Sequence, residues 1–382
     1  MSGFVFQKVS NFIVGIDSLT QLNDECLKLK IQNVLVVTDQ GLVMQGIAKK
    51  VTDQLQIDHQ LYTDVQADPP DHVVLSAVDF AKRSQVDGVI GLGGGSAMDV
   101  AKLIAVLAHP NQTQPLQAMY GVDQVQPPRL PLIQIPTTAG TGSEVTPIAI
   151  VTTGETTKSG VVSPILYADT AILDAKLTVN LPTHITAATG IDAMVHAIEA
   201  YTSKLKKNPY SDLLAIQSLK LLNQALPVAL KFPQDLEARQ QMLFGAMLAG
   251  QAFANAPVAA VHALAYPLGG HCHLSHGHSN TLVLCEVLKF NAPAAETLYA
   301  ELMQALNPSA NGSTSELCQQ FITHMQTICE QSGLKLKLSE LDITEDLLDT
   351  LAHDAILQTR LLQNNPRELS EADAFAIYQA VF

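Results

Sequence analysis

Apolar runs and helix-like segments alternate along the first half of the chain. Runs rich in β-branched residues lie at 33–39 ("NVLVVTD"), 87–96 ("DGVIGLGGGS") and 130–138 ("LPLIQIPTT"). Between the second and the third run, residues 96–108 repeat apolar positions at the spacing of an α-helix. Unbroken apolar strands that alternate with helices predict a parallel sheet covered on both faces. Ligands of such sheets bind at the carboxyl ends of the strands.

This pattern changes near residue 180. Pro182 interrupts the chain, and the sequence beyond it is rich in Ala, Leu, Gln and Glu, with few runs of Val. The last expected helix begins with Ser370 and Asp373 at the spacing of a capping box. We therefore predict an α/β domain over residues 1–180 and an all-helical domain over residues 181–382.

Composition and charge narrow the class of protein. Of 382 residues, 47% are apolar and only 15% are charged, which indicates large cores, subunit contacts, or both. No uninterrupted apolar run of about 18 residues occurs, so we expect no membrane span, and the N-terminal segment lacks a secretory pattern. The net charge of −14 argues against nucleic acid as a partner. Five cysteines without a C-x-x-C motif fit a reduced, cytoplasmic protein.

A glycine-rich turn, "GLGGGSAMDVAK" (91–102), joins an expected strand to an expected helix. Glycines let backbone N–H groups approach a phosphate, and a helix N-terminus adds free donors. The turn departs from the G-x-G-x-x-G fingerprint because Ser96 replaces its last glycine, and no acid follows about 20 residues later. Asp39, at the end of an earlier strand, is a candidate for the ribose. Tight packing alone would also explain the glycines, but phosphate binding explains this turn better.

A second loop, "PTTAGTGSEVTP" (136–147), also follows an expected strand. It is rich in hydroxyl side chains and glycines, which are common in ordinary turns, so the loop alone is weak evidence. Two such loops at the ends of neighbouring strands indicate one shared ligand.

Candidate metal ligands lie in the second half. In the expected helix "GIDAMVHAIEAY" (190–201), Asp192 and His196 are one turn apart on one face, the spacing that H-E-x-x-H motifs use. The pair alone could be an ordinary helix contact, and His262, in an apolar segment, could be a core histidine. The stretch 271–280 adds further candidates, which are His271, Cys272, His273, His276 and His278. One Asp with three imidazoles suits Fe²⁺ or Zn²⁺ rather than Mg²⁺ or Ca²⁺.

Five ordered motifs resemble the iron-containing (group III) alcohol dehydrogenase family over nearly the whole chain. They are "VVTD", "GGGSAMDVAK", "PTTAGTGSEVT", "GIDAMVHAIEAY" and "HALAYPLGGHCHLSHG". The resemblance implies an N-terminal Rossmann-like α/β domain and an all-α C-terminal domain, the architecture shared with dehydroquinate synthase, with the active site in the cleft between them. It implies a D-x3-H pair, a third histidine and a fourth fourteen residues later. These ligands fall on Asp192, His196, His262 and His276.

The same resemblance implies contacts to NAD. The residues matching its cofactor positions are Asp39, Gly94, Gly95, Ser96, Asp99, Thr137, Thr138 and Lys158. The resemblance implies that Asp39 favours NAD over NADP, because its carboxylate repels a 2′-phosphate. Several positions depart from the family. Tyr266 stands where a second histidine is usual, Asp68 where Asn-Pro is common, Cys285 and Ser275 where Pro is usual, and Cys272 where an aromatic residue is common. We expect Tyr266, His271 and His273 to lie near the substrate, and His278 to face solvent or cap a helix.

The expected reaction is reversible hydride transfer between a primary or short secondary alcohol and NAD, with Fe²⁺ or Zn²⁺ as Lewis acid. The resemblance implies a homodimer. Alternatives are a hydroxyacid–oxoacid transhydrogenase, a zinc polyol dehydrogenase of the glycerol type, a dehydroquinate-synthase-like lyase, and a silent metal- or nucleotide-binding protein. A lyase for anionic substrates should need basic residues in the C-terminal cleft, yet residues 250–285 contain no Lys or Arg.

Overall fold

The computed structural model describes residues 3–154 and 157–382, which form two compact units. The sheet unit comprises Gln7–Asn180 and Gln234–Phe244. The helical unit comprises the N-terminal residues through Phe6, Leu181–Pro233 and Gly245–Phe382. The chain therefore passes from sheet to helices at Asn180, and helix α8 begins in the sheet unit and continues into the helical one.

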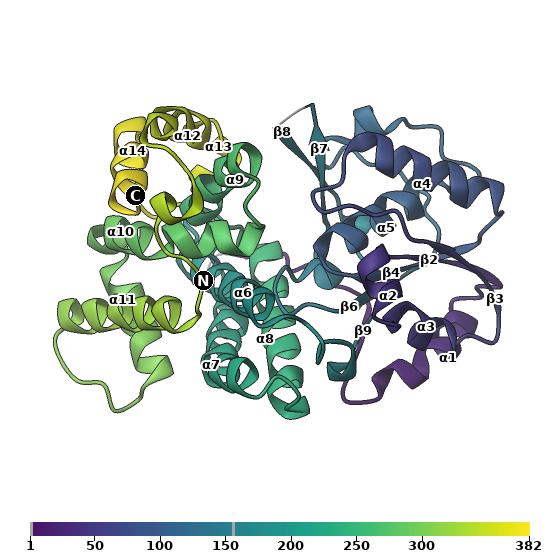
Figure 1. The fold of residues 1–382 in the computed structure, drawn as a ribbon, viewed down its shortest axis with the longest axis horizontal. Helices are drawn as coiled ribbons and strands as arrows, with labels where there is room; N and C mark the ends of the chain where they lie inside the picture. The colour runs from purple at the N-terminus through teal and green to yellow at the C-terminus, as the bar shows by residue number, and fades with distance from the viewer. Residues whose placement is uncertain (1–2, 155–156) are drawn as a thin grey trace. The chain divides into compact units, whose positions relative to one another are not determined.

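A six-stranded parallel sheet forms the centre of the sheet unit (Figure 1). Its strands, in spatial order, are β1 (Asn11–Val14), β9 (Thr170–Leu173), β6 (Leu132–Pro136), β4 (Gly88–Gly93), β2 (Asn33–Val37) and β3 (Asp58–Tyr62). Every neighbouring pair is parallel. The three strands expected from the apolar runs are β2, β4 and β6, and they lie side by side. The predicted α/β class with a parallel sheet is confirmed.

Helices bury both faces of this sheet, which explains the unbroken apolar runs. The helices of the unit are α1 (Leu22–Lys28), α2 (Gln40–Met44), α3 (Ile47–Thr52), α4 (Asp71–Arg83) and α5 (Gly95–Leu107). On one face, alternate strand residues such as Val36, Ile90 and Ile135 share a core with residues of α1 and α3. On the other face, α5 approaches so closely that a methyl group on Gly91 would lie 2.9 Å from the Ala101 Cβ.

A second, three-stranded sheet lies beside α5 in the same unit. Its strands are β5 (Gly121–Val122), β8 (Thr157–Val162) and β7 (Ile148–Thr153), with β7 antiparallel to β8. Short 3₁₀ segments complete the described chain; they are Ser18–Gln21, Leu116–Met119, Ser143–Val145, Pro164–Leu166, Ala175–Leu177, Leu338–Leu341 and Glu345–Leu347.

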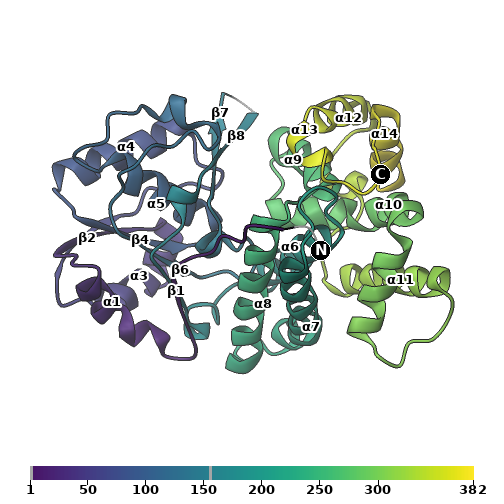
Figure 2. The same cartoon turned by 180° about the vertical axis from the view of Figure 1, so that it is seen from behind.

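The helical unit contains only helices and their connections among the described residues (Figure 2). They are α6 (Thr183–Thr202), α7 (Pro209–Lys231), α8 (Leu236–Asn255, in part), α9 (Ala260–Cys272), α10 (His276–Leu306), α11 (Thr314–Gln331), α12 (Leu348–Ile356), α13 (Thr359–Leu362) and α14 (Glu371–Ala380). The α14 start has the expected capping box, in which Ser370 and Asp373 each accept the backbone N–H of the other. The predicted all-α class of this half is confirmed.

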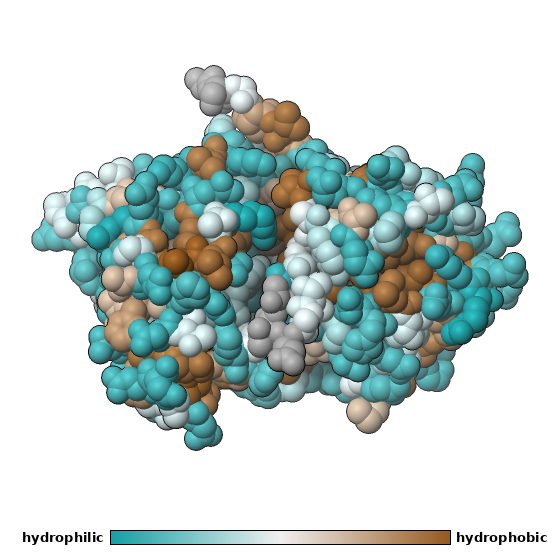
Figure 3. All heavy atoms as spheres, turned by 90° about the horizontal axis from the view of Figure 1, so that it is seen from above, coloured by the Kyte–Doolittle hydropathy of each residue, from teal (hydrophilic) through white to brown (hydrophobic). Residues whose placement is uncertain are grey.

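By length and composition, α7 is apolar enough to cross a membrane, and the pair α8–α9, bent by 105°, would pass only if taken as one span. Such helices are weak evidence for a membrane protein, because core helices of soluble proteins share these properties. Here α7 packs along α6 and also contacts α10. Figure 3 shows a mostly hydrophilic face with separate hydrophobic patches.

Candidate active site

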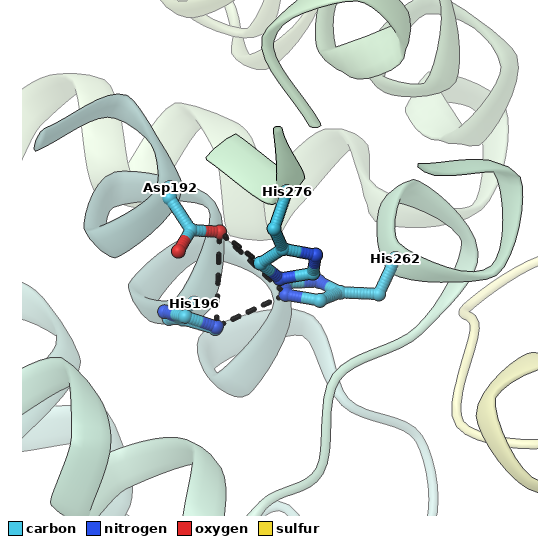
Figure 4. Close-up of side chains that lie close together, drawn as sticks. All are labelled: Asp192, His196, His262 and His276. Carbon is cyan, nitrogen blue, oxygen red and sulfur yellow. Dashed lines mark hydrogen bonds and ion pairs between the residues drawn. The ribbon is translucent and has the colours of Figure 1, made fainter. Parts of the chain in front are cut away.

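Four side chains from three helices of the helical unit converge on one point (Figure 4). Asp192 and His196 project from α6, His262 from α9 and His276 from the first turn of α10. One candidate ligand atom from each lies within 4.8 Å of all the others. Asp192 Oδ1 is 3.9 Å from His196 Nε2, 3.8 Å from His262 Nε2 and 3.5 Å from His276 Nε2. Among the described residues this is the only such group of three or more.

Local structure places these ligands. Asp192 and His196, at i and i+4, share the buried face of α6. The start of α10 reaches them because Gly277 has no side chain: a methyl group there would lie 2.3 Å from the Ala188 carbonyl oxygen of α6. Three of the ligands are buried, whereas the His276 side chain is 31% exposed. The open side of the group is therefore at His276, and a catalytic metal site needs such an opening.

The hydrogen bonds of His262 indicate that the group is built for a cation. Its Nδ1 lies 2.7 Å from Glu199 Oε2, and because a carboxylate only accepts, Nδ1 carries the proton. The bare Nε2 of His262 then faces His196 Nε2 at 3.0 Å. A carboxylate behind a ligating imidazole is the usual outer partner in metal sites. The donor set of one carboxylate and three imidazoles fits Fe²⁺ or Zn²⁺.

The carboxylate of Asp192 is the charged member of the group. Burial alone would raise its pKa, but the imidazoles of His196, His276 and His262 and the Asn280 amide together hold that pKa below its usual value. Asn280 Nδ2 donates to Asp192 Oδ1 at 2.6 Å. The fully buried Asn280 lies one turn after His276 on α10. The ionised form that a metal requires is therefore the favoured form here.

Replacing Glu199 with glutamine should weaken metal binding by about 10- to 100-fold, the usual loss for an outer partner of a ligand. Glu199 accepts from both His262 Nδ1 and the Val261 N–H, each at 2.7 Å. An amide offers a single acceptor oxygen, so one of these bonds is lost. Competition with a chelator measures the affinity. Glu296→Gln, at an exposed α10 position, is the matched control. Equal affinities in both variants would contradict a positioning role for Glu199.

Asp192, His196, His262 and His276 together form the metal-type group. The remaining residues of the histidine-rich stretch lie outside it. His271 Nε2 is 2.6 Å from Asp354 Oδ2 on α12. His273 is exposed and ends α9 in a left-handed conformation with φ of 54°. His278 Nε2 donates a hydrogen bond to the Lys335 carbonyl oxygen at 2.7 Å. Burial raises the pKa of Cys272, which disfavours the thiolate that a metal ligand must be.

Among the candidate catalytic residues, Tyr266 makes a ring contact with a member of the metal-type group. Its ring centroid is 6.0 Å from that of His276, the partly exposed member. The geometry therefore brings Tyr266 to the open side of the group. His271 pairs with Asp354 instead, and His273 lies at the surface.

The two loops expected to bind the cofactor meet in the sheet unit. β4 and β6 are neighbours, so the glycine turn and the hydroxyl-rich loop leave the same edge of the sheet. A methyl group on Gly94 would lie 3.6 Å from Thr138 Oγ1, and one on Gly95 would lie 3.0 Å from Thr141 Cγ2. Helix α5 begins at Gly95, so its first N–H groups point into this loop pair. Such an N-terminus suits a phosphate.

Asp39 stands beside the glycine turn. It follows β2, the neighbour of β4, and caps α2 by accepting the Leu42 N–H at 3.0 Å. A methyl group on Gly93 would lie 3.9 Å from Asp39 Oδ2. An acid therefore stands at the adjacent strand end, and its contact with a ribose stays a prediction.

Asp99 is turned inward in the structure. Its Oδ1 accepts from Ser143 Oγ at 2.6 Å and its Oδ2 from the Ile150 N–H at 2.9 Å. Lys102, fully buried, donates to the Ile148 carbonyl at 2.6 Å and to Ser143 Oγ at 2.7 Å, and lies 3.4 Å from Asp99. This network ties α5 to the loop after β6 and to β7. A contact between Asp99 and the cofactor stays a prediction.

A buried glutamate adjoins this network. Burial raises the pKa of Glu144 to about 7, against the opposing effects of a backbone hydrogen bond and Lys102. Burial likewise lowers the pKa of Lys102 and raises that of Asp99, although each charge partly offsets the shift in the other. Two acids thus share one buried cation behind the cofactor loops.

Sequence reasoning missed the groups that support the ligands. Glu199 lies three residues after His196, and Asn280 lies four residues after His276, so helical spacing places each next to a ligand on its own helix. The ligands that they hydrogen-bond, His262 and Asp192, lie on other helices. The partners brought together by tertiary packing had no such signal. They are Asp354 for His271 and Ser143 for Lys102.

A parallel sheet with a phosphate-type turn, together with an Asp–His₃ set, defines a metal-dependent, nucleotide-linked oxidoreductase. Two family descriptions match: "Iron-containing alcohol dehydrogenase" over residues 10–175, and "Fe-containing alcohol dehydrogenase family, C-terminal" over residues 186–382. The long-chain-alcohol dehydrogenase 1 of Geobacillus thermodenitrificans (strain NG80-2) is 42% identical over 99% of this chain and 96% of its own.

Solved structures agree. A 1,3-propanediol oxidoreductase superimposes with a TM-score of 0.95 at 30% identity, covering 100% of both chains. The sulfoacetaldehyde reductase from Bifidobacterium kashiwanohense, in complex with NAD⁺, has a TM-score of 0.90 at 26% identity, covering 100% of this chain and 99% of that one. This chain belongs to the iron-containing alcohol dehydrogenase family.

The protein is therefore an NAD-dependent, metal-dependent alcohol dehydrogenase that transfers hydride between an alcohol and the nicotinamide. The family, the reaction class and the cofactors NAD and iron, all expected from sequence, are confirmed.

Proposed function

We propose that Asp192, His196, His262 and His276 bind Fe²⁺, or Zn²⁺ in its place, and that the substrates are primary or short secondary alcohols and their carbonyl products. The observation that carries the proposal is the convergence of one carboxylate and three imidazoles within 4.8 Å. Bound there, the metal supplies Lewis acidity toward the alcohol or carbonyl oxygen. Glu199 and Asn280 orient the ligands, and the partly exposed His276 marks the side from which substrate approaches.

For the cofactor, the proposal assigns the glycine turn to the diphosphate and the loop after β6 to the nicotinamide side. The residues involved are Gly94, Gly95, Ser96 and Asp99 for the first, and Thr137 and Thr138 for the second. Lys158 adds a positive charge on β8, and Asp39 receives the ribose hydroxyls. The contact between the two loops at Gly94 and Thr138 supports one shared ligand. Asp99 contributes indirectly, because its carboxylate accepts hydrogen bonds that hold Ser143 and the Ile150 N–H in place.

Near the substrate, we assign Tyr266 a direct role. Its hydroxyl replaces the usual histidine of the family and donates a hydrogen bond or a proton. His271 and His273 remain proposed neighbours of the substrate. The short contact between His271 and Asp354 would keep the imidazole oriented.

The decisive experiment is metal analysis of protein purified without oxygen, combined with an NAD-linked screen. The panel runs from methanol to long-chain primary alcohols and includes hydroxy acids, because the relative at 42% identity is a long-chain-alcohol dehydrogenase. We expect about one iron or zinc per chain and NADH formation with primary alcohols. Full metal loading without oxidation of any primary or short secondary alcohol would sink the substrate assignment. Activity with hydroxy acids alone would favour the transhydrogenase alternative.

Removing the Asp39 carboxylate should shift the cofactor preference toward NADP by roughly ten-fold, because one repulsive charge next to the 2′-phosphate is lost. Asp39→Gly is suitable, since glycine costs an N-cap only a few tenths of a kcal/mol. Asp39→Ser is the matched variant, because it keeps a capping oxygen for α2 but removes the charge. The ratio of kcat/KM for NADP and NAD is measured. A wild type that already prefers NADP would show that Asp39 does not have this role.

We further propose a cytoplasmic homodimer with a dinucleotide-binding domain over residues 1–180 and a metal and substrate domain over residues 181–382. Exposed apolar residues support self-association: Phe4 is 45% and Val5 81% exposed in the N-terminal segment of the helical unit. Apart from its own copy, the proposed binding partners of the protein are small-molecule alcohols and aldehydes. Light scattering of the purified protein tests the dimer.

A further inference from the structure

Asp68 and Lys158 form an ion pair at the edge of the sheet unit. Lys158 Nζ donates to Asp68 Oδ1 at 2.7 Å. The Lys158 side chain on β8 is only 11% exposed, whereas that of Asp68 is 49% exposed. An ammonium group with so little access to water depends on its protein partner more than the lysine of an ordinary surface pair does. Asp68 is therefore the main counter-charge seen for Lys158 in the structure.

The backbone around Asp68 is fixed on both sides. Its N–H donates to Ser96 Oγ at 3.3 Å, and its carbonyl accepts from Thr152 Oγ1 at 2.9 Å. The next carbonyl, of Pro69, accepts the Thr152 N–H at 2.9 Å. The φ of Asp68 is 49°, a left-handed conformation that Asp and Asn tolerate better than most residues. The backbone of Asp68 is thus held between the start of α5 and β7, and its carboxylate reaches Lys158 on β8.

This arrangement couples Asp68 to the expected position of the diphosphate. Ser96 is the residue after the glycine turn, and because its Oγ accepts the Asp68 N–H, its own O–H proton remains a donor for a phosphate oxygen. A diphosphate bound there would meet Lys158 already paired and would face the Asp68 carboxylate. Asparagine, common at this position in the family that the sequence resembles, would present neither obstacle.

We propose that Asp68 is a positioning residue that competes with the cofactor diphosphate for Lys158, and thereby lowers dinucleotide affinity and speeds NADH release. The inference rests on the proposed placement of the diphosphate at Ser96 and Lys158. It concerns a balance of charges at one site: the carboxylate that weakens binding also keeps Lys158 oriented when no cofactor is bound.

The test is NADH binding to the metal-loaded protein, followed by nicotinamide fluorescence, with release followed by stopped flow. Asp68→Asn should lower the Kd of NADH and the release rate by about five-fold, the usual scale of one partly exposed charge pair. Asparagine keeps the left-handed backbone accessible. Lys158→Met should raise the Kd. In the Lys158→Met background, Asp68→Asn should lower the Kd by less than about two-fold, because only the direct repulsion between Asp68 and the diphosphate remains.

Asp79→Asn, at an exposed position of α4, is the control for the change in net charge and should leave the Kd unaltered. The inference is overturned if Asp68→Asn leaves the affinity unchanged or weakens it while Lys158→Met still weakens it. It is also overturned if Asp68→Asn tightens binding equally with and without Lys158, since the effect would then be one of general charge. If Lys158→Met has no effect on NADH binding, the cofactor placement under the proposed function fails instead, and this inference fails with it.

Discussion

Replacing His276 with alanine is expected to remove the metal and the NAD-linked activity together. His276 Nε2 lies 3.5 Å from Asp192 Oδ1, and its loss leaves three candidate ligands, two of them on one helix. Even outer partners of metal ligands are worth about 10- to 100-fold in affinity, so losing a ligand should cost more than about 100-fold. Metal content after gel filtration and alcohol oxidation with NAD are the two measurements.

His278→Ala is the matched control from the same turn of the chain. Its imidazole meets the Lys335 carbonyl and not the metal-type group, so this variant should keep its metal and most of its activity. If His278→Ala lost the metal and His276→Ala kept it, the ligand assignment would be reversed. The comparison separates a missing ligand from general damage to the start of α10.

Replacing Lys102 with methionine should destabilise the protein by about 3–5 kcal/mol, the usual result of removing one partner of a buried ion pair. Methionine keeps most of the volume but not the charge. Asp99 and Glu144 would then share a buried region without their cation, and the Ile148 carbonyl would lose its donor. Urea denaturation of the variant and the wild type measures the difference in their free energies of unfolding.

Lys82→Met, at an exposed position of α4, controls for the loss of a lysine and should change stability by less than about 0.5 kcal/mol. Should Lys102→Met prove equally neutral, the buried ammonium would be unnecessary for stability. NAD affinity, measured on the folded variant, would then show whether the network serves the cofactor loops alone.

Strands β2, β4 and β6 were predictable because burial on both faces leaves a continuous apolar run, which no other element of that length shows so clearly. The glycine turn was located for a related reason, since a phosphate-binding junction between a strand and a helix concentrates glycines. Neither signal contains the spatial order of the strands. That order put Asp39, at the end of β2, beside Gly93, which the local spacing rules had not indicated.

The candidate metal site shows where periodicity stops being informative. The spacing of Asp192 and His196 predicts a shared face, but nothing local connects that face to His262 or chooses one histidine from the stretch 271–280. The family resemblance made that choice, and the structure brings His276 to the other three. His271, with a partner 83 residues away, and Asp99, turned toward Ser143, depend on packing between distant segments, which local patterns do not encode.

Helix α6 supplies Asp192, His196 and Glu199 from one face, at successive turns. Each residue of an α-helix is rotated by about 100° from the one before. A single-residue insertion or deletion between Asp192 and Glu199 would turn the members beyond it away from His262, whereas substitutions on the opposite face of the helix would leave all three in place. The length of this stretch is therefore constrained as well as its composition, since every residue from Gly190 to Thr202 is also buried. In the connection between α9 and α10, helical spacing does not place the ligand. There the closeness of Gly277 to α6 holds His276 in position.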